Sequence, residues 1–198
     1  MATTTVRYII DPRLSRFTVQ AYAGGFLSGF GHNPTIAIRD FTGDAAFSPE
    51  ALEESSLCLK IRADSLEVTN DVSDKDRREI ERTMKDEVIQ TAQYPDIQYQ
   101  SSVASVSELG PSRYRVNLSG KLSLHGVTRE QPLVADMSVS GDTLRAFGSF
   151  SVLQSDFGIT LVSVAGGALK VKDELKCSFD VAARKHEGNE KGAGSSCV

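Results

Sequence analysis

The first candidate for chemistry in this 198-residue chain is His32, which lies in the glycine-rich stretch GGFLSGFGHNPTI, Gly24–Ile36. A catalytic histidine needs a nucleophile to activate and a group to orient it. Ser28 precedes His32, and Asp40 and Asp44 follow it, but the sequence does not form a nucleophile elbow. We therefore assign no catalytic residue, and a small hydrolase or isomerase centred on His32 remains an alternative.

A metal ion at His32 would need two or three further ligands. The only other histidines are His125, which has outward strand parity at a turn, and His186, which lies near the C-terminus. We predict no metal site from so few ligands. Two interpretations of His32 stay open: a hydrogen bond to the headgroup of a bound ligand, or a structural hydrogen bond at the turn.

A second concentration of ionisable residues is DVSDKDRREIERTMKDEV. Its acidic and basic residues alternate at helical spacing, which is typical of a solvated helix face rather than of acid–base catalysis. Ser73 can cap the N-terminus of this helix, with an acidic residue three positions later. Ile80, Met84 and Val88 form a narrow apolar stripe. We predict an amphipathic helix over about 73–90 whose stripe lies on a sheet or across its open end.

Most of the remaining chain alternates apolar and polar residues with a period of two, which indicates half-buried strands. The apolar face of YRVNLSGKLSLHG consists of Val116, Leu118, Leu122 and Leu124. Similar runs, separated by turn sequences, give about eight strands and predict an all-β barrel or sandwich. The alternation slips by one between Ile38 and Phe41, so we expect a bulge near Arg39–Asp40 that bends the strand around a closing sheet.

Composition excludes several classes of protein. The 22 Lys and Arg residues and 26 Asp and Glu residues give a net charge of −4, which argues against a nucleic-acid partner. No stretch approaches the ~18 uninterrupted apolar residues of a membrane span. The N-terminal sequence MATTTVRYIID lacks the basic and apolar regions of a secretory signal. We expect no nucleic-acid partner, no transmembrane segment and a cytoplasmic location.

Several of the strand sequences together resemble the YceI-like polyisoprenoid-binding family. The similar segments are YIIDPRLSRFTVQA, YPDIQYQSS, YRVNLSGKLSLHGVTREQPL, and SDFGIT followed by LKVKDELKCSFDVAA, in the family's order over residues 6–183. The resemblance implies one domain over residues 1–184, an elongated, lipocalin-like antiparallel β-barrel of about eight strands. The tail 185–198 has no apolar periodicity and is predicted to be disordered.

The resemblance also implies a function for the barrel, which is to bind, transport or store a long isoprenoid chain such as a polyprenyl lipid or a quinone tail. It implies no catalytic residue and no cofactor, and it implies a homodimer in many relatives. An isoprenoid chain carries few polar atoms, so its burial would supply affinity at ~25 cal/mol per Å² of apolar surface. A barrel without a cavity, acting as an interaction module through a dimer or partner surface, is the alternative.

The predicted cavity lining combines the inward strand faces with the glycine-rich stretch, which we expect at the barrel rim as a gate. Its residues are Phe17, Val19, Ala21, Phe26, Phe30, His32, Ile36, Leu118, Leu122, Leu124, Phe150 and Phe157. The segment VLQSDFGIT departs from the family, because it has Gln154 where relatives usually have a basic residue. That difference bears on the headgroup of the ligand.

Overall fold

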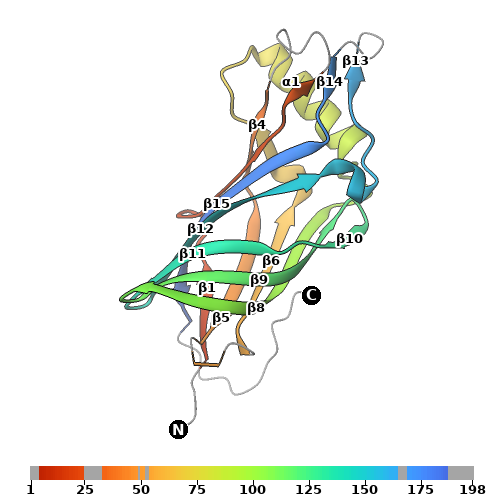
Figure 1. Ribbon diagram of the computed structural model, residues 1–198. Coiled ribbons are helices and arrows are strands. Elements are labelled where there is room, and N and C mark those ends of the chain that lie inside the picture. Colours follow the sequence, from red (N-terminus) through yellow and green to blue (C-terminus); the bar gives the residue numbers. More distant parts are fainter. Residues whose placement is uncertain (1–4, 25–32, 49, 52–53, 165–168, 187–198) are drawn as a thin grey trace.

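The computed structural model describes residues 5–24, 33–48, 50, 51, 54–164 and 169–186 (Figure 1). Eight of its strands close an antiparallel barrel. In spatial order they are β1 (Val6–Ile10), β5 (Phe41–Phe47), β6 (Ser56–Arg62), β8 (Asp96–Gly110), β9 (Arg113–Leu124), β11 (Leu133–Ser140), β12 (Thr143–Leu153) and β15 (Glu174–Lys185). The circle closes where Ile10 of β1 pairs with Ala183 of β15. The predicted antiparallel barrel of about eight strands is confirmed.

Three shorter strands lengthen the barrel at one end. They are β2 (Arg16–Gln20), β4 (Thr35–Ile38) and β7 (Leu66–Val68), and they extend the sheet in the order β15-β2-β4-β7. The chain passes from β4 to β5 at Arg39–Asp40, where the sequence alternation slips. There β4 pairs with β2 and β7, whereas β5 pairs with β1 and β6. The slip therefore marks a break between two strands with different partners, not a bulge within one strand.

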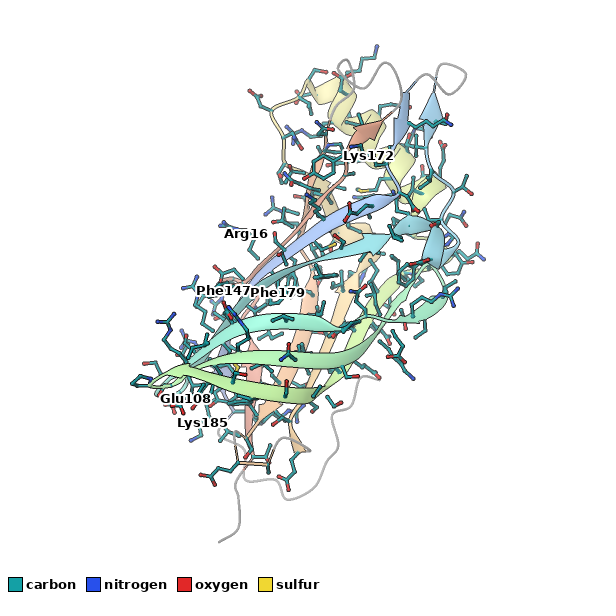
Figure 2. The ribbon with its side chains drawn as sticks, in the orientation of Figure 1. Arg16, Glu108, Phe147, Lys172, Phe179 and Lys185 are labelled. Carbon is teal, nitrogen blue, oxygen red and sulfur yellow. The ribbon has the colours of Figure 1, made fainter. Side chains whose placement is uncertain are left out.

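Strand β15 joins the two parts of this sheet. Its residues 176–180 pair with β2, its residues 183–185 pair with β1, and β12 pairs along its other edge. Figure 2 places Lys172, just before β15, at one end of the molecule and Lys185 toward the other. Consequently β15 runs along the barrel, and its length can be used to estimate the length of the barrel interior.

The remaining strands and short turns are small. Strand β10 (Val127–Glu130) pairs with β9, and β13 (Ser163–Val164), β14 (Leu169–Val171) and β3 (Ala23–Gly24) form a separate three-stranded sheet. Two 3₁₀ turns, η3 (Ala63–Ser65) and η5 (Gln154–Phe157), follow β6 and β12. The three-stranded sheet and the helix lie at the same end of the barrel (Figure 1).

The helix α1 (Asp74–Thr83) continues into a π-helical turn, η4 (Met84–Val88), so the predicted helix over about 73–90 is confirmed. As predicted, Ser73 is the N-cap, and its hydroxyl accepts a hydrogen bond of 3.1 Å from the backbone N–H of Asp76. No helix in the described ranges is long and apolar enough to cross a membrane.

Two charged side chains fasten α1 to the barrel. The carboxylate Oε1 of Glu81 accepts a hydrogen bond of 2.8 Å from the backbone N–H of Val68 in β7. The guanidinium of Arg77 donates to the backbone oxygen of Val68 and, at 3.0 Å, to that of Asn70. Because β7 is the last strand of its sheet, these side chains satisfy backbone groups that a further strand would otherwise pair.

The hydrophobic core occupies the barrel interior. The predicted inward residues of β9, Val116, Leu118, Leu122 and Leu124, are all buried. Gly120 continues the same face, and a Cβ atom there would lie 2.3 Å from the hydroxyl oxygen of Tyr99. The glycine thus leaves room for the Tyr99 ring against the neighbouring strand, and the ring fills space that a larger residue would otherwise take.

Candidate functional site: an apolar cavity in the barrel

The barrel encloses a cavity of about 340 Å³. Its lining includes the inward residues of β15 from Leu175 to Ala183. At ~3.3 Å per residue, that stretch of strand is roughly 26 Å long, so the cavity is long and narrow. The volume is at the lower end of the range of ~300–1,000 Å³ for ligand sites. The shape suits a slender molecule better than a compact one.

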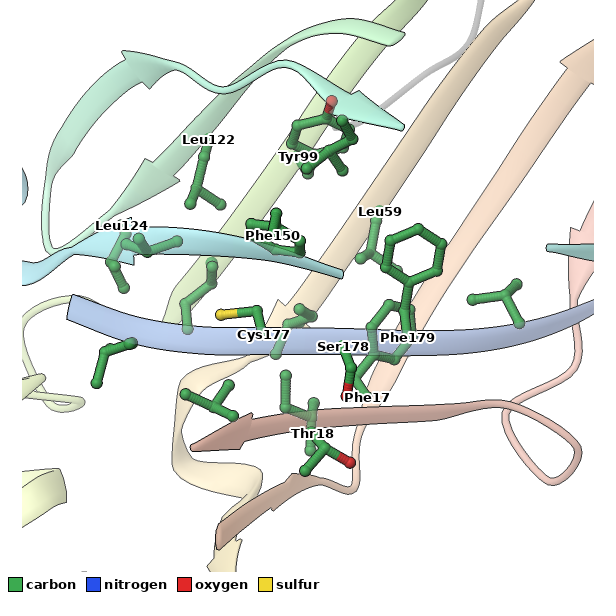
Figure 3. A pocket seen from close by; sticks show the side chains of 18 of the residues that line it. Phe17, Thr18, Leu59, Tyr99, Leu122, Leu124, Phe150, Cys177, Ser178 and Phe179 are labelled. Carbon is green, nitrogen blue, oxygen red and sulfur yellow. The ribbon is translucent and has the colours of Figure 1, made fainter. Parts of the chain in front are cut away.

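Strand alternation brings the predicted lining residues together where the structure describes them. Eight of them line the cavity: Phe17, Val19, Ala21, Ile36, Leu118, Leu122, Leu124 and Phe150. Figure 3 shows Phe17, Leu122, Leu124 and Phe150 around it, together with Leu59 and Phe179. Their contact with a ligand stays a prediction.

The other four predicted lining residues have a different outcome. Phe157 is buried, with 2% of its surface exposed, but it lies in η5 and is not among the residues that line the cavity. Phe26, Phe30 and His32 fall outside the described residues. The gate at Gly24–Ile36 and the role of His32 therefore stay predictions.

The helix closes one end of the cavity. Its apolar stripe, Ile80, Met84 and Val88, faces the cavity and is joined there by Ile89. The stripe thus lies across an end of the barrel, which was one of the two placements expected from the sequence. The contacts of Arg77 and Glu81 with β7 hold this lid in place.

Phe179 shapes the middle of the cavity. It lines the wall from β15, and it pairs with Gly148 in β12. A Cβ atom at Gly148 would lie 2.6 Å from the Phe179 ring, so only glycine leaves the ring its position. Phe17, its partner across the strand pair, packs edge-on against Phe41 with ring centroids 4.8 Å apart.

The described lining contains two ionisable side chains, and burial alters both. Loss of solvent raises the pKa of the Cys177 thiol to about 12. Burial likewise raises the pKa of Tyr99 to about 12, against a smaller opposing effect of a hydrogen bond with Ser101. The Tyr99 hydroxyl donates to the backbone oxygen of Gln131 at 3.0 Å, and Figure 3 shows it directed away from the other lining side chains. Both groups stay protonated at neutral pH.

Gln154, which the sequence analysis singled out only as a departure from relatives, is the buried polar residue of the cavity wall. The described part of the chain has three buried polar residues, Ser48, Ser55 and Gln154, and of these only Gln154 lines the cavity. Its amide nitrogen donates to the backbone oxygens of Lys172, at 2.9 Å, and Asp173, at 3.4 Å. These partners lie about eighteen residues away, so no local pattern points to them.

His125 differs from the expectation of a solvent-facing turn residue. It is half-buried, its Nδ1 lies 3.2 Å from the backbone oxygen of Phe157, and its ring centroid is 4.5 Å from that of Tyr94. The reason is that η5 and the segment after η4 cover the turn between β9 and β10. Among the described residues there is no group of three or more His, Cys, Asp or Glu side chains that could hold a metal ion.

Comparison with known proteins agrees with this architecture. The model of the YceI-like domain matches residues 8–183. Among solved structures, BcnA of Burkholderia cenocepacia aligns with a TM-score of 0.64 and 18% identity, over 87% of this chain and 98% of that one. A polyisoprenoid binding domain from Saccharophagus degradans, implicated in plant cell wall breakdown, aligns with a TM-score of 0.65 and 15% identity, over 90% of this chain and 98% of that one.

A more distant structural match is the YCEI protein of Campylobacter jejuni, with a TM-score of 0.54 and 17% identity, over 77% of this chain and 85% of that one. At these identities the structures support the shared fold. No curated protein matches the chain.

Proposed function

The chain belongs to the YceI-like domain family, and from that premise we propose that it binds one long-chain isoprenoid lipid inside its barrel, as a carrier or a store. The observation that carries the proposal is the long, narrow, almost wholly apolar cavity. The Saccharophagus degradans structure, described as a polyisoprenoid binding domain, supports the choice of ligand class.

The physical argument rests on burial. A flexible chain of isoprene units presents apolar surface along its whole length, and each CH₂ group that leaves water contributes about 0.8 kcal/mol. The lining offers aliphatic and aromatic side chains from every barrel strand, so such a chain would find apolar contacts from the helix end to the far end of β15.

We propose a binding role without catalysis. The ionisable side chains of the described lining, Tyr99 and Cys177, are protonated at neutral pH because burial raises both pKa values to about 12. A protonated thiol is a poor nucleophile. The alternative of an interaction module without a cavity is disfavoured by the open interior, while a homodimer and a cytoplasmic location stay predictions.

The test is the content of the purified protein. Protein produced in a bacterial host and examined by native mass spectrometry should carry added mass that organic extraction releases as one prenyl lipid per chain. An extract containing no lipid, from protein that also fails to take up added prenyl alcohol, would refute the proposal.

A further inference from the structure

One polar group in the cavity wall has unused hydrogen-bonding capacity. The residue Gln154 is 5% exposed and lines the cavity directly after β12, whose end lies on the helix side of the barrel (Figure 1). A buried amide normally has all its polar atoms paired, since an unpaired one costs free energy. The hydrogen-bond partners of the two polar side-chain atoms of Gln154, Nε2 and Oε1, therefore show whether one of them is free to bind a ligand.

The orientation of the Gln154 amide follows from its partners. Its Nε2 lies 2.9 Å from the backbone oxygen of Lys172 and 3.4 Å from that of Asp173. Both partners are carbonyl oxygens, which can only accept, so the nitrogen must face them and the oxygen must face elsewhere. Within the described ranges, both side-chain hydrogen bonds of Gln154 are made by Nε2, and no residue donates a hydrogen bond to the Oε1 atom.

The local backbone keeps this arrangement rigid. The N–H of Gln154 donates to the oxygen of Asp173 at 3.1 Å, and the N–H of Ile159 donates to the oxygen of Gln154 at 3.2 Å. Ser155 adds two hydrogen bonds to the Asp173 carboxylate, from its N–H at 2.8 Å and its hydroxyl at 2.5 Å. These hydrogen bonds join turn η5 to the segment before β15 and fix the position of the Gln154 side-chain amide.

Other polar groups in the lining lack this combination. Tyr99 already donates its hydroxyl proton to Gln131. Five further polar residues line the cavity, and none of them is buried as Gln154 is: Thr18, Ser56, Thr83, Gln98 and Ser178.

We propose that the Oε1 atom of Gln154 accepts a hydrogen bond from the headgroup of the bound lipid, which makes the ligand a hydroxyl donor. This inference rests on the proposed function and narrows it to prenyl alcohols and hydroquinones, in preference to quinones, esters and ethers that only accept. Because Lys172 marks the helix end (Figure 2), the headgroup lies under α1 and the tail points toward Ala183.

Two probes of nearly equal size test the proposal: geranylgeraniol and its methyl ether, which lacks the donor. Titration of the full-length protein, followed by displacement of a fluorescent lipid, should give a preference for the alcohol of about fivefold or more, the effect of one buried hydrogen bond. Gln154→Met should remove the preference while retaining both ligands. The matched control is Gln100→Met, the same exchange at an exposed residue of β8 outside the cavity lining, and it should keep the preference.

The outcomes separate this inference from the proposed function. If neither probe binds the unaltered protein, the proposed function itself fails. If both bind equally, or if the preference survives in Gln154→Met, the assignment of Gln154 is overturned while lipid binding stands. Equal binding of the two probes by the unaltered protein would overturn the assignment even if Gln154→Met does not fold.

Discussion

An aromatic ring placed inside the cavity should block the ligand without unfolding the barrel. Ala146 in β12 lines the cavity and is half-buried, and its cross-strand neighbours, Met137 and Val181, line it as well. The substitution Ala146→Phe projects a ring into the empty space between them. Because space is available, we expect a cost to the free energy of unfolding below the ~1–3 kcal/mol typical of an overpacked core.

The loss of affinity can be estimated from the displaced surface. If the ring takes the place of about 100 Å² of ligand surface, part of the 150–250 Å² that a buried aromatic side chain covers, the loss is ~2.5 kcal/mol at ~25 cal/mol per Å². That energy corresponds to a roughly 70-fold weaker dissociation constant. Isothermal titration with geranylgeraniol, combined with thermal melting, measures both quantities.

The matched control is Ser149→Phe. Ser149 lies on the same strand but on the exposed outer face, so an added ring there should leave ligand affinity unchanged. Equal affinities for the unaltered protein and a folded Ala146→Phe variant would refute the reasoning, because the ligand would then not occupy this part of the barrel.

Three further predictions follow from individual contacts. Arg77→Met removes hydrogen bonds that hold α1 over the cavity, so stopped-flow measurements should show ligand release about fivefold faster. Gly120→Ala places a Cβ atom 2.3 Å from the Tyr99 hydroxyl, so denaturant unfolding should show a loss of about 1–3 kcal/mol, partly restored by Tyr99→Leu. Hydrogen bonds from Ser155 hold the pKa of Asp173 below its usual value. The free energy of unfolding that they contribute is present above the ordinary pKa of about 3.9 and is lost as pH falls through the lowered pKa. Asp173→Asn should therefore make the free energy of unfolding fall less steeply at acid pH.

Each of these has its own control and contrary result. The control is Arg82→Met on the same helix, because Arg82 forms ion pairs with Glu79 and Glu87 and should not affect ligand release. Release at the unaltered rate in the Arg77→Met variant as well would contradict the role of Arg77 in holding α1 over the cavity. A Gly120→Ala variant as stable as the parent would contradict the close approach of Tyr99. An acid limb unchanged in Asp173→Asn would show that other carboxylates set it.

Strand and helix periodicity predicted most of the fold. The buried face of β9 and the capped helix from Ser73 follow from local pattern, because burial on one face imposes a period on the sequence. The slip at Arg39–Asp40 located an irregularity, but the predicted bulge was wrong, because strand partners that the local pattern does not record make it a break between β4 and β5. The pairing of β15 with both β1 and β2 joins distant segments, and no periodicity records which strands become neighbours.

The candidate site could be predicted only where it follows strand parity. Phe157 was expected in the lining because its segment reads as a strand, but η5 interrupts the alternation there and places the ring elsewhere. Gln154 owes its role to backbone carbonyls of Lys172 and Asp173, which any residue type could supply. His125 is covered by segments that pack on it only in the folded barrel.

The most direct test of the central claim is a high-resolution crystal structure of the protein loaded with geranylgeraniol. We predict continuous, chain-shaped density along the barrel axis, with its hydroxyl beside Gln154 and its tail directed toward Ala183. A lumen filled by side chains or ordered water, with the lipid absent or bound on the outer surface, would contradict the account.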